Sequence, residues 1–117
     1  MVSDIVTSSK AIQPNLLINL HVVPWRENDF GGAIKKIVGQ DISHLSKYTD
    51  YLSPMCYSHM LKREADWVSS VVRDFDSQTN GTSVLPSIQV KEAYLEDVLT
   101  EEEFKDNLKE ADRKSVV

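Results

Sequence analysis

The chain has a single cysteine, no strongly basic segment and no long apolar run. The one cysteine, Cys56, excludes an internal disulfide and a zinc site built from several thiolates. Because Cys56 lies within an apolar run, we expect it to be a buried, unreactive thiol. The net charge of -5 argues against binding to nucleic acid or to an anionic membrane, since both require a basic surface.

No apolar stretch approaches the ~20 residues that span a bilayer. The N-terminal segment lacks a basic start followed by an apolar core, so we expect no signal peptide in it. The sequence indicates no particular cellular compartment. A hydrophobic content of 41% and a charged content of 26% are typical of a globular domain, and a length of 117 residues fits one domain over 1–117.

Three apolar runs recur at nearly constant spacing: Leu16–Val23, Tyr51–Tyr57 and Val84–Val90. One further step of about 32 residues reaches the terminal valine pair, which we expect to begin another strand of a longer barrel. Within each run, alternate residues form one mixed face and one apolar face. Asn19 and His21, for example, share the mixed face of the first run.

Helical patterns separate the runs. A stripe at i, i+4 and i+8 spacing predicts one buried helix face: Trp67, Val68, Val71, Val72 and Phe75. The first residues of the chain also have the pattern of a helix, so the predicted order is a helix followed by three strand-helix units.

The last helix has the clearest start. Thr100 and Glu103 match a capping box, in which each residue binds the other's backbone N–H. Phe104, Leu108 and Ala111 are the predicted buried stripe of this helix.

Strands that alternate with helices predict parallel pairing with right-handed crossovers. The unit length matches the roughly 31 residues per unit of a (β/α)8 barrel of about 250 residues. We therefore predict an α/β fold, a partial (β/α)8 TIM barrel with three parallel strand-helix units, and the alternative is a small open parallel α/β sheet. Pro54 and Pro86 lie inside two of the predicted strands, so we expect a bulge or irregular pairing at both.

Ligands of parallel α/β folds bind where the carboxyl ends of the strands meet. The residues near these ends are the candidate site: His21, Trp25, Arg26, Asp29, Tyr57, His59, Gln89 and Glu92. Simpler roles are open for several of them. His21 can bond inside a barrel, Arg26 and Asp29 can pair with each other, and Trp25 can cover the core instead of stacking on a sugar. No cofactor site is predicted, since Gly31-Gly32 lacks the third glycine of a dinucleotide loop. No metal site is predicted, since His44 falls on a predicted helix away from the other two histidines.

The segments HVVPWR, DYLSPMCYSHML and LPSIQVKEAY resemble a group of uncharacterised bacterial glycoside-hydrolase-like barrel proteins. The resemblance runs from about Leu16 to Val117 and implies the later strands of a carbohydrate-related (β/α)8 domain. Glycoside hydrolysis generally uses two carboxylates. Gln89 stands where many barrel glycosidases place a nucleophilic glutamate, which leaves Asp29 and Glu92 as the catalytic candidates and the other six residues as substrate-binding candidates. We expect the chain to be inactive without the rest of the barrel.

A non-catalytic module is the competing hypothesis. An unclosed parallel sheet leaves two open edges that can pair with another chain. The predicted partner is then a second copy of the chain or the remainder of the barrel, joined through the strand edges.

Overall fold

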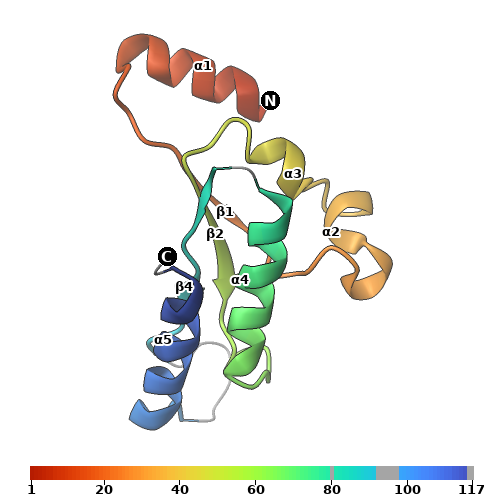
Figure 1. The fold of residues 1–117 in the computed structure, drawn as a ribbon, viewed down its shortest axis with the longest axis vertical. Coiled ribbons are helices and arrows are strands. Elements are labelled where there is room, and N and C mark those ends of the chain that lie inside the picture. The colour runs from red at the N-terminus through yellow and green to blue at the C-terminus, as the bar shows by residue number, and fades with distance from the viewer. Residues whose placement is uncertain (80, 92–97, 116–117) are drawn as a thin grey trace.

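A computed structural model describes residues 1–79, 81–91 and 98–115 of the chain, and Figure 1 shows their arrangement. The fold is mixed α/β with an open parallel sheet of four strands. The elements in chain order are α1 (Val2–Ile12), β1 (Asn19–Val22), η1 (Asp29–Gly31), α2 (Ala33–Lys36), α3 (Ile42–Leu45), β2 (Tyr51–Cys56), α4 (Asp66–Gln78), β3 (Ser83–Val84), β4 (Ser87–Ile88) and α5 (Glu101–Ser115).

The sheet is built around β2, which pairs with β1 and with both β3 and β4. β2 pairs with β3 and, beyond a short gap, with β4, and the register is the same in both pairings. Leu52 pairs with Val84, and Met55 pairs with Ser87. The gap places Pro86 opposite Pro54, and neither proline has an N–H to donate to the ladder. The expected irregular pairing is therefore confirmed, and because the register is unchanged it involves no bulge.

One face of the sheet forms the core. The strand side chains on this face share one buried cluster with side chains from the four α-helices that follow β1: Val22, Leu52, Cys56, Val84, Ile34, Ile42, Trp67, Val68, Val71, Val72, Phe75 and Ala111. The predicted stripe of α4 is thus confirmed. Because α2, α3, α4 and α5 all contribute to this cluster, these four helices lie on the same side of the sheet.

The opposite face of the sheet is more polar. Asn19 and His21 project from β1 on this side and are exposed, as the two-residue alternation predicts. Ser53 of β2 donates a hydrogen bond of 3.0 Å to Asn19 Oδ1 across this face. The two faces therefore differ in chemistry, with an apolar side under the helices and a side that is open to solvent along β1.

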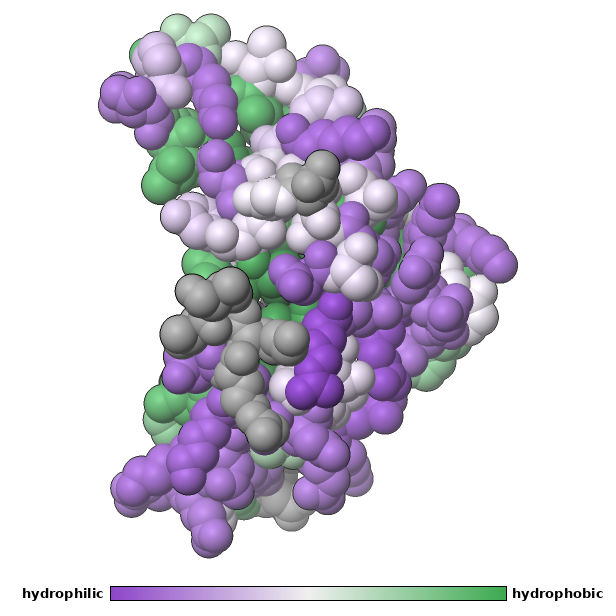
Figure 2. All heavy atoms as spheres, in the orientation of Figure 1, coloured by the Kyte–Doolittle hydropathy of each residue, from purple (hydrophilic) through white to green (hydrophobic). Residues whose placement is uncertain are grey.

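The N-terminal helix α1 confirms the helix predicted for the first residues, and it lies at the end of the molecule (Figure 1). Val6 is its buried residue, whereas Ile5 and Ile12 are exposed. Figure 2 shows apolar surface in the region of α1. Asp50, which directly precedes β2, accepts hydrogen bonds from Ile18 N at 2.8 Å and from Lys10 Nζ at 3.4 Å. This carboxylate therefore links α1 to the start of the sheet.

The orientation of α5 corrects one sequence-based expectation. Leu108, predicted to be buried, is 49% exposed, whereas Asn107 is 1% exposed. Ala111 is buried as predicted, and Phe104 is half-buried. The helix is therefore turned so that an amide, instead of the leucine beside it, faces the rest of the fold.

Candidate functional site

Three adjoining cavities of about 560, 420 and 180 Å³ lie where β1 and β2 end. The two larger cavities share Lys62, Arg63 and Glu64, and the two smaller ones share Arg63 and Trp67. Their walls come from the loop after β1, the loop after β2, and the first turns of α4 and α5. We call this region the carboxyl-edge site.

The two loops of the site contain unusual backbone conformations. Phe30, after β1, and Lys62, after β2, each have φ of 54°, and they are the non-glycine residues with positive φ within the described ranges. The second loop is folded back by hydrogen bonds from Leu61 N to Tyr57 O at 3.0 Å and from Arg63 N to Ser58 O at 2.8 Å. Such conformations cost about 1–3 kcal/mol each and tend to occur at binding sites.

His59 and Glu103 join the loop after β2 to the start of α5. Nδ1 of His59 lies 2.9 Å from both carboxylate oxygens of Glu103. Thr100 Oγ1 accepts a hydrogen bond of 3.1 Å from the Glu103 backbone N–H, which is one half of the expected capping box. The Glu103 carboxylate contacts the imidazole of His59, and this contact fixes the orientation of the ring.

Behind this pair, Ser58 and Asn107 form a buried polar contact. Both residues are 1% exposed, and Ser58 Oγ donates a hydrogen bond of 2.8 Å to Asn107 Oδ1. Among the described residues, Asn107 Nδ2 is buried without a hydrogen-bond partner. A buried donor of this kind costs about 1–3 kcal/mol, so the contact is a specific polar feature within the packing of α5 against the loop.

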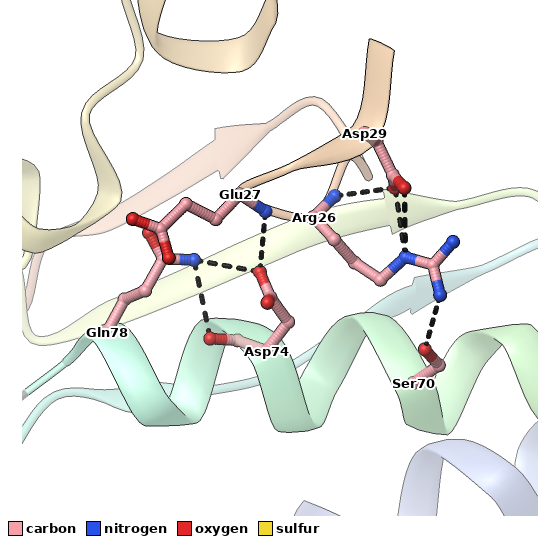
Figure 3. Close-up of polar contacts among 6 residues, drawn as sticks. All are labelled: Arg26, Glu27, Asp29, Ser70, Asp74 and Gln78. Atoms are coloured by element: carbon pink, nitrogen blue, oxygen red, sulfur yellow. Dashed lines mark hydrogen bonds and ion pairs between the residues drawn. The ribbon is translucent and has the colours of Figure 1, made fainter. Parts of the chain in front are cut away.

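Arg26 is the centre of a second polar cluster, shown in Figure 3. Its Nε donates to both oxygens of Asp29 at 3.0 and 3.2 Å, its backbone N–H donates to Asp29 Oδ2 at 2.9 Å, and its Nη1 donates to Ser70 Oγ at 2.9 Å. Partial burial acts to raise the pKa of Asp29, but the hydrogen bonds from Arg26 and the charges of Arg26 and Arg63 outweigh it and hold the pKa below 3.8. Asp29 is therefore ionised at neutral pH.

Asp74 of α4 fixes the same loop at its next residue. Its Oδ2 accepts a hydrogen bond of 2.8 Å from the Glu27 backbone N–H and one of 2.9 Å from Gln78 Nε2 (Figure 3). The loop after β1 is thus attached to α4 through Ser70 and Asp74, which lie one helical turn apart. This attachment holds the Arg26 guanidinium in the wall of the 420 Å³ cavity.

Aromatic side chains lie beside these polar groups. Trp25 and Phe30 contact each other edge to face, with ring centroids 5.2 Å apart, and both line the 180 Å³ cavity. The Arg63 guanidinium lies 5.8 Å from the centre of the Trp67 ring. The site therefore combines aromatic surface with hydrogen-bonding groups of both charges.

The structure places the predicted site residues in different surroundings. It brings Trp25, Arg26, Asp29 and His59 to the carboxyl-edge site. His21 is exposed on β1, outside the lining of these cavities. The predicted roles of Trp25, Arg26, Asp29, His59 and His21 in ligand binding or catalysis stay predictions.

The remaining predicted residues lie near the ends of β2 and β4 or beyond the described ranges. Tyr57 is half-buried directly after β2. Gln89 is 6% exposed, and its side chain accepts from Met60 N at 2.9 Å and donates to Lys91 O at 2.8 Å. It thereby ties the segment after β4 to the loop after β2. Glu92 lies outside the described residues.

Several residues of the site were not among the predicted ones: Lys62, Arg63, Trp67, Ser70 and Glu103. Trp67 was assigned to the core stripe, and at 9% exposure it belongs to the core while also lining two cavities. The sequence does mark Glu103, but as a cap of its own helix. A signal for Lys62 and Arg63 was their position in the loop that follows a strand.

Cys56 is fully buried, and burial raises the pKa of its thiol to about 12, which confirms the expectation that it is buried. Among residues 1–79, 81–91 and 98–115, no group of three or more His, Cys, Asp or Glu side chains is arranged to hold a metal ion. None of the helices in these ranges is long and apolar enough to cross a membrane. Comparison with protein-family models, curated proteins and solved structures finds no match to this chain.

Proposed function

We propose that the chain is part of a glycoside-hydrolase-like (β/α)8 barrel and that it contributes a carbohydrate-binding surface at the carboxyl-edge site. The observation that carries this proposal is the placement of α2, α3, α4 and α5 on one face of a parallel sheet whose strands β1, β2 and β3 are neighbours in chain order. A doubly wound sheet has helices on both faces, whereas a barrel has its helices on the outer face alone.

The open face of the sheet supports the same architecture. Parallel sheets are almost always covered on both sides. Here the side that carries Asn19, His21 and Ser53 is polar and exposed along β1, and the described helices that share the core lie on the other side. Further strands that close the sheet would turn this face toward the interior of a barrel.

The chemistry of the site favours a sugar as its ligand. Sugars present hydroxyl groups, which pair with charged and amide groups, and apolar ring faces, which stack on aromatic rings. Trp25 and Trp67 supply aromatic surface, and Arg26, His59 and Glu103 supply oriented polar groups in the adjoining cavities. Binding a sugar does not require the strongly apolar pocket that binds hydrophobic ligands.

The predicted catalytic pair is Asp29 with Glu92. Both oxygens of Asp29 accept hydrogen bonds from Arg26, so in the described geometry Asp29 orients the guanidinium. We therefore propose sugar binding as the activity of this chain by itself, and hydrolysis only where the remaining barrel strands are present. Glycoside hydrolysis generally uses two carboxylates that flank the bond to be cleaved.

Fluorescence titration tests the binding proposal, because both tryptophans of the chain line the site. Cellotetraose, xylotetraose, maltotetraose and chitotetraose are the probes. We expect a saturable change with at least one of them and a loss of roughly tenfold in affinity for Arg26→Gln, about 1.4 kcal/mol. Arg73→Gln, an exposed arginine on α4, is the matched control and should bind as the unmodified chain does. Absence of saturation with all four sugars, in a chain that is folded by circular dichroism, would overturn the proposal.

A second candidate function follows from the sheet edges. Within the described residues, β1 pairs only with β2, and β3 and β4 pair only with β2, so both outer edges have unpaired backbone groups. Such edges are templates for pairing with another strand. We propose, as the alternative, a module that assembles with a second copy through these edges. Light scattering decides this alternative: a monodisperse monomer of 13.3 kDa with a cooperative melt contradicts it, and a stable dimer supports it.

A further inference from the structure

Three cationic and two acidic side chains line the 420 Å³ cavity. Arg26, Lys62 and Arg63 all line it, although the net charge of the chain is -5. Two carboxylates, Glu64 and Asp66, also line it. Within the described ranges, neither of them makes an ion pair with Lys62 or Arg63, whose side chains have no carboxylate within ion-pair distance there.

Arg26 is held in a fixed orientation at this wall. Asp29 accepts from its Nε and Ser70 accepts from its Nη1, which immobilises the planar guanidinium. In the described structure Nη2 of Arg26 makes no hydrogen bond, so a terminal nitrogen of an oriented guanidinium is available to a ligand acceptor. Guanidinium groups of this kind match the geometry of carboxylates and phosphates.

Arg63 is held in a different way. Its guanidinium carbon lies 5.8 Å from the centre of the Trp67 ring, and in the described part of the chain its side-chain N–H groups make no hydrogen bond. Lys62, the adjacent residue, has a left-handed backbone and lines both the 420 and 560 Å³ cavities. Its strained conformation therefore places an ammonium-bearing side chain at the boundary of the two cavities.

We propose that this cavity, lined by Arg26, Lys62 and Arg63, is a subsite for an anionic group carried by the bound sugar, a carboxylate or a phosphate. This inference rests on the proposed carbohydrate function and narrows its ligand class to acidic sugars. The sugar ring lies beside the aromatic surface of Trp25 and Trp67, while the anionic substituent faces the cationic wall.

The test compares each acidic sugar with an uncharged counterpart. The probes are trigalacturonate and its fully methyl-esterified form, titrated into the full chain and followed by tryptophan fluorescence. We expect trigalacturonate to bind at least tenfold more tightly than the ester, and we expect this preference to shrink as ionic strength rises. Glucose 6-phosphate, compared with glucose, is the phosphate arm, and a larger preference in this arm assigns the anionic group as a phosphate.

Variants connect this preference to the cavity. Arg63→Gln and Lys62→Gln should each reduce the preference for the charged ligand several-fold, measured as the ratio of the affinities of the same variant for the acid and the ester. Arg73→Gln and Lys47→Gln, which change exposed cations outside the cavity, should leave it unchanged.

The outcomes separate this inference from the proposed function. If acid and ester, and phosphate and parent sugar, bind equally well, the anionic subsite is overturned while sugar binding stands. If the preference persists in both cavity variants, it arises elsewhere and the assignment to this cavity fails. If no charged or neutral sugar binds, the proposed function itself fails.

Discussion

Nδ1 of His59 lies 2.9 Å from both oxygens of the Glu103 carboxylate, although the two residues are 44 positions apart in the chain. The contact ties the first turn of α5 to the loop after β2, and both residues line the largest cavity of the carboxyl-edge site. Glu103 therefore orients the His59 imidazole and also helps to hold α5 beside the loop after β2.

Replacing Glu103 with alanine should lower the free energy of unfolding by about 1 kcal/mol, a value reduced from that of a buried charged hydrogen bond because the carboxylate is partly exposed. Urea denaturation measures this change. Glu102→Ala is the matched control, since Glu102 is exposed at the preceding position of the same helix turn, and its effect should be within about 0.5 kcal/mol of zero. Equal effects of the two substitutions would show that the His59 contact adds nothing to stability.

The attachment of the loop after β1 to α4 gives a local prediction. Because the Glu27 backbone N–H donates to Asp74 Oδ2 at 2.8 Å, Asp74→Ala should speed hydrogen exchange at the Glu27 amide by tenfold or more. Asp76→Ala, which removes an exposed carboxylate of the same helix, should leave that amide unchanged. Amide-resolved exchange by NMR makes the comparison. An unchanged rate in Asp74→Ala would mean that the loop is held without this hydrogen bond.

The sequence predicts the parts of this fold that depend on local periodicity. The apolar stripe from Trp67 to Phe75 repeats at helical spacing, and its burial follows from that spacing alone. The alternation of Asn19 with Leu20 correctly separates the two faces of β1. The sequence also places Arg26 and Asp29 after this strand, and their mutual pairing, which was one of the two roles left open for them, is present in the structure.

Contacts between distant segments were not predictable in the same way. Glu103 matches a capping box, yet its carboxylate contacts His59 because α5 packs beside the loop after β2, which no local pattern records. Hydropathy likewise places Leu108 inside and Asn107 outside. The reverse arrangement occurs because the hydroxyl of Ser58 supplies Asn107 with a hydrogen bond that the sequence pattern does not indicate.

The contact between Asp50 and Ile18 predicts a pH dependence of stability. The hydrogen bond from the Ile18 backbone N–H lowers the pKa of Asp50 below 3.8, and the charge of Lys10 adds to this effect. A carboxylate whose pKa is lower in the folded state stabilises the fold above its unfolded pKa and loses that contribution as the pH falls through the folded value. Asp50→Asn should therefore be less stable than the unmodified chain at neutral pH.

The difference should decline as the pH falls from near 3.8 through the lower pKa of the folded chain. Thermal melts across this pH range, with Asp106→Asn as an exposed control, measure the difference at each pH. If the difference in melting temperature between Asp50→Asn and the unmodified chain stays constant across the range, the effect comes from the shape of the side chain. That result would exclude the ionisation of Asp50 as its cause.

The buried pair of Ser58 and Asn107 leads to a prediction about non-additivity. Ser58→Ala leaves both ends of the Asn107 amide buried without a partner, so it should cost about 1–3 kcal/mol. Asn107→Leu leaves the Ser58 hydroxyl unpaired and should cost a similar amount. In the double variant no buried polar group of the pair is left, and leucine has the same branched side-chain skeleton as asparagine, so most of the lost stability should return.

A double-mutant cycle by urea denaturation measures this return as a coupling energy. The control cycle combines Ser58→Ala with Leu108→Asn, which introduces the same amide at the exposed neighbouring position and should give additive effects. Additivity in the Ser58 and Asn107 cycle as well would show that the hydroxyl and the amide do not depend on each other. Because Asn107 Nδ2 has no hydrogen-bond partner among the described residues, we expect the double variant to be at least as stable as either single variant.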